Sequence, residues 1–188
     1  RDRHNTEPSV KSIFPFTILL TADIRGASLA LPYLLKERIM DVNGRFIMHS
    51  ERMTLTDVRG RIKDTPLRAS GTIILYEDMP ALDLSFTTDK TNLMHVFETI
   101  IPLKALGMQG SCAADFTLRG KLNNLIFSGT FSNAYGRLMH IPFDAAAGTF
   151  TITPHDISVS MKEGRVAGGP SVITMRWPFN TCLLYTSP

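Results

Sequence analysis

The sequence is short of the residues that build disulfide scaffolds, metal clusters and membrane spans. Only two of its 188 residues are cysteines. The second, Cys182, lies in the segment 182–188, which we interpret as read-through from a sequencing adapter and set aside. The remaining thiol, Cys112, has no intrachain disulfide partner, so we expect it to act as a small apolar residue inside a sheet. No apolar run reaches the roughly 18 residues that a membrane-spanning helix needs.

A strong excess of charge is also missing. The formal net charge is +3 at pH 7, and the basic residues are dispersed. Arg59, Arg61 and Lys63 alternate, which predicts three cations on one face of a strand. Such a row could meet phosphate groups, but a solvated strand face is the interpretation that we favour. We expect no nucleic-acid partner.

Recognisable catalytic motifs are absent as well. The five histidines stand alone, without a zinc-type spacing: His4, His49, His95, His140 and His155. His155 precedes Asp156, but adjacent strand residues point to opposite faces, so this pair does not predict acid–base chemistry. No Gly-x-Ser-x-Gly elbow occurs, and the glycine-rich run 164–170 lacks the P-loop lysine, so it predicts a turn. We therefore expect no catalytic residue, metal or cofactor.

What the sequence does contain is short runs in which apolar and polar residues alternate. In one run, Leu82, Leu84 and Phe86 are separated by Asp83 and Ser85. The same alternation recurs at Met53 and Leu55, Ile73 and Leu75, Phe116 and Leu118, Leu125 and Phe127, Phe150 and Ile152, and Ile157 to Met161. Period two predicts strands with one apolar and one polar face. Because Gly, Asn, Asp and Pro separate the runs, we expect an antiparallel meander.

Two segments depart from this rhythm and predict short amphipathic helices, at 29–40 and 91–106. They look like copies, because a shift of 66 positions carries Gly44 onto Gly110 and Leu34–Leu35 onto Ile100–Ile101.

The chain is expected to have two parts. We expect a polar lead-in of a truncated chain at 1–15. A repeat β-sheet domain should follow at 16–181, with approximate units 16–81 and 82–170.

The predicted sheet has more apolar surface than two short helices can cover. The remainder must be covered by a second sheet in a closed sandwich, by the sheet curling on itself, or by a ligand. In a curled sheet the apolar face would line an open groove. The residues alone leave the closed core and the open groove as alternatives.

Two passages resemble the AsmA/TamB class of bacterial envelope proteins. They are residues 44–75 and 110–132. Their shared pattern is a pair of alternating apolar residues, a glycine, a polar turn and a second apolar run with glycine. It is carried by Met53, Leu55, Val58, Gly60, Pro66, Leu67 and Gly71, and again by Phe116, Leu118, Gly120, Leu125, Phe127 and Gly129.

This resemblance implies a mainly β fold: a repetitive antiparallel sheet curled into an open groove, or β-taco, with one or two short amphipathic helices. It implies a protein in the periplasm of a diderm bacterium, anchored to the inner membrane, that conducts phospholipid to the outer membrane. An Omp85-type outer-membrane barrel is the implied partner of TamB-like members. Phospholipid acyl chains would contact Met53, Leu55, Leu75, Leu84, Phe86, Phe116, Leu118, Phe127, Phe150 and Ile152.

Two other functions compete with a lipid conduit. A scaffold or chaperone for barrel-protein assembly or autotransporter secretion would act through free strand edges. A β-repeat adhesin would need exposed aromatic platforms, whereas the aromatic residues mostly occupy apolar positions of the alternation. An enzyme is the interpretation that the residues favour least.

Overall fold

The computed structural model describes residues 17–30, 38–75, 79–92, 109–138 and 140–178, and all regular structure in these ranges is β. The strands are β1 (Leu19–Leu29), β2 (Ile39–His49), β3 (Arg52–Ile62), β4 (Thr65–Ile74), β5 (Ala81–Asn92), β6 (Gln109–Lys121), β7 (Ile126–Leu138), β8 (Ile141–Ile152), β9 (Asp156–Val166), β10 (Gly169–Pro170) and β11 (Ile173–Pro178). The prediction of a mainly β protein is confirmed. The division into two repeat units stays a prediction.

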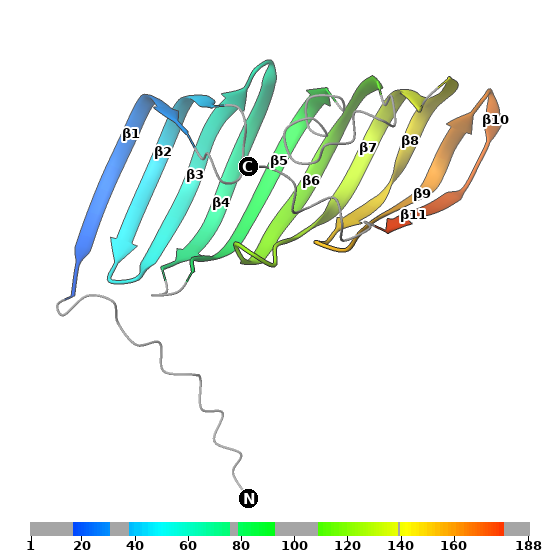
Figure 1. Ribbon diagram of the computed structural model, residues 1–188. Helices are drawn as coiled ribbons and strands as arrows, with labels where there is room; N and C mark the ends of the chain where they lie inside the picture. Colours follow the sequence, from blue (N-terminus) through cyan, green and yellow to red (C-terminus); the bar gives the residue numbers. More distant parts are fainter. Residues whose placement is uncertain (1–16, 31–37, 76–78, 93–108, 139, 179–188) are drawn as a thin grey trace, which may run out of the picture.

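The strands form one antiparallel sheet in which neighbours in sequence are neighbours in space (Figure 1). The order runs from β1 to β10 without a crossover, and β11 returns to pair with β9. The predicted meander is thus confirmed. The glycine-rich run 164–170 contains a tight hairpin: Ala167 and Gly168 both have positive φ (50° and 84°), which matches the twist of the flanking strands.

The helix predicted at 29–40 is wrong at both of its ends, because Leu29 belongs to β1 and Ile39 and Met40 belong to β2. Leu29 lies opposite Ile39 across the sheet. The rest of this predicted helix, 31–37, lies outside the described residues.

The helix predicted at 91–106 is wrong at its start. Thr91 and Asn92 continue β5 and pair with Cys112 and Ser111 of β6. Pairing with a neighbouring strand satisfies the backbone N–H and C=O groups of these two residues, and threonine is well suited to a strand. Residues 93–108 lie outside the described residues.

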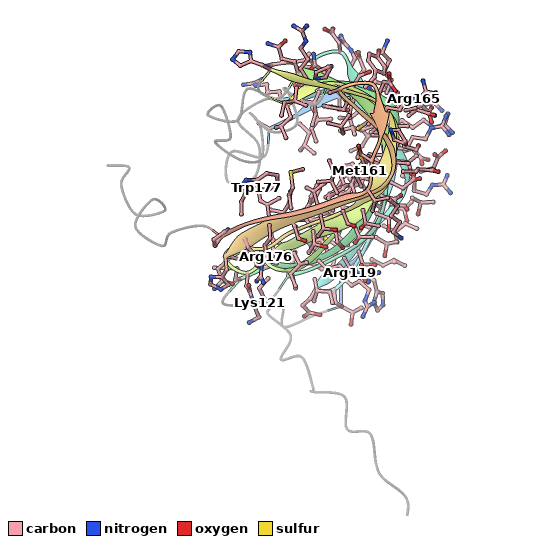
Figure 2. All side chains as sticks on the ribbon, turned by 90° about the vertical axis from the view of Figure 1, so that its right-hand side faces the viewer. Arg119, Lys121, Met161, Arg165, Arg176 and Trp177 are labelled. Carbon is pink, nitrogen blue, oxygen red and sulfur yellow. The ribbon has the colours of Figure 1, made fainter. Side chains whose placement is uncertain are left out.

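Over its described strands the sheet is neither closed nor strongly curled, but it is bent. Seen along the row of strands, the ribbon follows an arc that is open on one side (Figure 2). Met161 and Trp177 lie on the inner side of this arc, whereas Arg119 and Arg165 point outward. The inner side is therefore the apolar side of the sheet.

Glycine allows close ring packing on that side at Gly129 of β7. This residue lies opposite Phe116 of β6 and opposite Phe150 of β8. A Cβ atom added at Gly129 would lie 2.7 Å from the Cα atom of Phe116 and 2.2 Å from the carbonyl oxygen of Asp115. No side chain larger than hydrogen fits this position without displacing the neighbouring strand.

We predict that Gly129→Val lowers the free energy of unfolding by about 1–3 kcal/mol, because the added atoms overpack the sheet. Gly168→Asn is the matched control: a Cβ atom there has no neighbour within 4 Å, and asparagine tolerates positive φ. Urea titrations give the comparison. Equal unfolding midpoints for Gly129→Val and the parent would contradict the packing described here.

Candidate binding face

The apolar face is continuous because directly opposed residues of antiparallel strands point to the same side of the sheet. One row crosses from β3 to β11 in register. It consists of Leu55, Gly71, Leu84, Leu118, Phe127, Ile152, Ile157 and Trp177. Every member is apolar or glycine, so an unbroken apolar path runs at right angles to the strands.

Aromatic rings of four consecutive strands contact one another on this face, and one of them, Phe127, belongs to the row itself. Phe86 and Phe116 lie directly opposite each other, with ring centroids 5.0 Å apart and an interplanar angle of 16°. The ring of Phe127 follows at 4.6 Å from that of Phe116, and the ring of Phe150 follows at 5.3 Å from that of Phe127. These separations lie in the range of favourable ring pairs, each worth about 0.5–1.5 kcal/mol beyond burial.

Nine of the ten residues predicted to line the site lie in strands and share this one face. Met53 is opposite Ile73, which is opposite Leu82, and this third row lies on the same side. The tenth residue, Leu75, comes directly after β4, where its N–H donates to the carbonyl oxygen of Glu51 at 2.7 Å. The register therefore brings the predicted strand residues together, whereas Leu75 is at the sheet margin.

Several residues of the same face were not among the predicted lining residues. Val42 and Val58 are 2% and 9% exposed, and Met161 is 6% exposed. Val58 follows Leu55 by three positions, so it breaks strict alternation. A spacing of three between two apolar residues of one strand was the signal that could have identified Val58. When a strand contains one extra residue between them, two such residues point to the same face of the sheet.

The opposite face is polar, and several of its charges form pairs between neighbouring strands. The row Ser85, Thr117, Ser128, Thr151, Ser158 and Arg176 runs directly beside the apolar row. Arg45 Nε donates to Asp23 Oδ1 at 2.8 Å, and this hydrogen bond lowers the pKa of the Asp23 carboxyl. Arg119 is paired in the same way with Asp83 at 2.8 Å.

The basic row predicted at Arg59 and Arg61 is part of this polar face, and both guanidinium groups have acidic partners. Arg59 donates to Asp57 at 2.8 Å and Arg61 to Asp41 at 2.5 Å, with both arginine side chains about half exposed. These pairs are solvated, so each contributes little to stability. The aspartate partners also neutralise the positive charge that would be needed to bind a phosphate group.

A small cluster of threonine side chains interrupts the apolar face in β4 and β5. Thr65, Thr88 and Thr91 are all buried, and the hydroxyl oxygens of Thr65 and Thr91 are 3.4 Å apart. The Thr88 hydroxyl has no hydrogen-bond partner within the described part of the chain. Cys112, opposite Thr91, is 5% exposed, and burial raises the pKa of its thiol to about 11. Its predicted place inside the sheet is confirmed.

The described residues bring no metal-binding set together. Among them there is no group of three or more His, Cys, Asp or Glu side chains that could hold a metal ion. His155 is exposed, and the neighbouring Asp156 carboxylate accepts hydrogen bonds from Arg176 and from Thr153 Oγ1 at 2.9 Å. Arg176 first, and then Thr153, lower the pKa of Asp156, which holds it as an anion in a structural pair.

No helix long and apolar enough to cross a membrane occurs within the described ranges. Comparison with known proteins identifies no relative: no family model matches the chain, and neither a curated protein nor a solved structure matches it.

We predict that the Cys112 thiol resists alkylation in the folded protein, since burial disfavours the reactive thiolate. In a Cys182→Ser background, iodoacetamide at pH 8 should modify Cys112 at least about a hundredfold more slowly than in urea, as expected for a thiol with a pKa well above the ambient pH. Mass spectrometry follows the reaction. Equal rates in both conditions would show that this part of the sheet opens freely.

Proposed function

We propose that this chain belongs to a periplasmic β-groove protein of the AsmA/TamB type that conducts phospholipid between the inner and outer membranes and supports outer-membrane integrity. The observation that carries the proposal is the apolar row from Leu55 in β3 to Trp177 in β11. All described strands belong to one sheet, so no second layer covers that row within the described ranges. In this proposal the bend of the sheet continues into the open groove of a β-taco.

Acyl chains suit such a face for an energetic reason. Each methylene group that leaves water for an apolar surface contributes about 0.8 kcal/mol, so a chain of ordinary length is held without a specific pocket. The aromatic stack and the aliphatic row offer similar contact at successive strands. A lipid would therefore move along the row with small changes in free energy, while its head group stays in water at the open side.

The polar face supports the same proposal. It holds Ser85, Thr117 and Ser128 in the row beside the apolar residues, and its arginines form solvated ion pairs. This face suits contact with the aqueous periplasm. Anchoring in the inner membrane and contact with an Omp85-type barrel remain parts of the proposal that rest on the resemblance alone. The proposed role is not enzymatic.

The proposal predicts lipid contact on one face only. Benzoylphenylalanine placed at Phe116 or Phe150 should crosslink phospholipid in cells, whereas the same probe at Thr117 or Thr151 should not. These pairs are adjacent in sequence and point to opposite sides of the sheet. Mass spectrometry of the purified protein identifies the adduct. Equal crosslinking from both faces, or from neither, would refute a lipid-binding groove.

A charge on the same face should block lipid passage. Phe116→Asp should reduce co-purified phospholipid at least about tenfold, because a carboxylate against acyl chains costs more than 1.4 kcal/mol. Thr117→Asp is the matched control and should keep the lipid. Circular dichroism and urea titration verify that both variants fold. Leu84→Asp and Phe127→Asp extend the test, although both positions are more deeply buried.

A second candidate function is a scaffold for barrel-protein assembly, and the edge strand β1 favours it. Among the described strands, β1 pairs with β2 alone, and Leu19 and Leu20 near its start are 74% and 55% exposed. An open edge of this length can add another strand. Crosslinks from β1 to nascent barrel proteins, with no lipid on the apolar face, would select this function.

A further inference from the structure

Most of the long strands contain one residue more than the strand beside them. In β3, the three steps from Leu55 to Val58 lie opposite the two steps from Gly71 to Ala69 of β4. In β7, the steps from Phe131 to Ala134 likewise exceed those from Gly148 to Ala146 of β8. Comparable shifts in register occur in β1, β2, β5, β8 and β9. These are β-bulges, which bend a strand and increase its twist.

The extra residues of β1, β2, β3, β7 and β8 have a backbone conformation that is costly for most side chains. Asp41, Asp57, Asn133 and Ala145 have φ angles of 54°, 46°, 50° and 47°, and Gly26 has a φ of 62°. Aspartate and asparagine tolerate this left-handed region better than most residues, yet each instance still costs about 1 kcal/mol or more. Such outliers persist where the surrounding structure fixes them.

The sequence compensates each bulge so that the apolar face is preserved. An inserted residue inverts the alternation beyond it. In β3 the apolar residues therefore change from odd positions, Met53 and Leu55, to even positions, Val58 and Ile62. In β7 they change in the same way between Phe131 and Ala134, which is 3% exposed. Removing the extra residue would restore strict alternation with the same side chains on the same face.

We propose that five extra residues are positioning residues that bend the strands of the sheet: Gly26, Asp41, Asp57, Asn133 and Ala145. The bend lets the two halves of each strand contact one layer of acyl chains from opposite sides. The inference rests on the proposed lipid function and adds the element that sets the width of the groove. The inward position of Met161 and Trp177 and the outward position of Arg165 agree with a bend toward the apolar side (Figure 2).

The decisive variant deletes Gly26, Asp41 and Asp57 together. β4 has no extra residue, and the three deletions remove every mismatch among β1, β2, β3 and β4, so the strands keep one regular register. The matched control, Asp41→Gly with Asp57→Gly, keeps the number of residues and eases the left-handed conformation. Like the deletion, it removes the carboxylates that bind Arg61 and Arg59. Crystal structures of the parent and both variants show the bend, and a benzoylphenylalanine at Leu55 reports lipid contact.

We expect the deletion variant to fold with straighter strands and to crosslink phospholipid roughly tenfold less than the parent, a loss that about two buried methylene groups per chain would produce. The glycine control should match the parent in bend and crosslinking. Undiminished crosslinking in a straightened sheet, or an unchanged bend after the deletions, overturns the inference while the lipid function stands. A parent protein that crosslinks no lipid overturns both.

A single deletion of Asn133 gives an independent test should the triple deletion not fold. It brings β7 into regular register with β6, with Asn133→Gly as its control. Phe150, two strands from Phe116, carries the probe in this half of the sheet. Loss of crosslinking in the deletion but not in the glycine variant supports the inference, and equal crosslinking in both overturns it.

Discussion

The structure depends on the correspondence between residue parity and sheet face. Cross-strand pairing places Leu84, Leu118 and Phe127 in one row, and it places Ser85, Thr117 and Ser128 in the next row on the other side. A slip of one residue in any of these pairs would exchange the two faces for the whole strand. The hydrogen bonds that hold the sheet together therefore also produce its apolar surface. Stability and the proposed function arise from the same register.

A long regular sheet of this kind would be nearly flat apart from its twist, and the bulges are what bend it. They add bend at a cost in backbone strain, and the sequence then shifts its apolar residues by one position, so that Val58 and Ala134, beyond the bulges of β3 and β7, stay on the apolar face. Asp41 and Asp57 serve twice, because their carboxylates also bind Arg61 and Arg59. Bend, face and surface charge are thus specified by the same few residues.

Alternation alone predicted the strands, the meander and the shared face of residues such as Leu84 and Phe116, because period two is a local property. It failed where a bulge intervenes. The ends of β1, β2 and β5 were interpreted as helical because the apolar residues in 31–39 and 93–101 have the spacing of an amphipathic helix. Val42 was not among the predicted lining residues. The resemblance implied a curled sheet, but the residues alone left a closed core and an open groove as alternatives, since the bend is the sum of small deviations over many strands that are paired only in the folded sheet.

The direction of the apolar row has a consequence for any amphiphile on it. Leu84 and Phe127 are 7% and 6% exposed, so neighbouring side chains already shield them, while the rings of Phe86 and Phe116 are only half-buried. A bound chain would contact ring surfaces that recur from strand to strand. Along β5 the half-buried ring of Phe86 is instead followed on this face by Thr88 and Thr91, which are polar and are 4% and 3% exposed. Contact of equal quality therefore continues only across the strands, and this is the direction in which the sheet could lengthen by further strands without changing its lining.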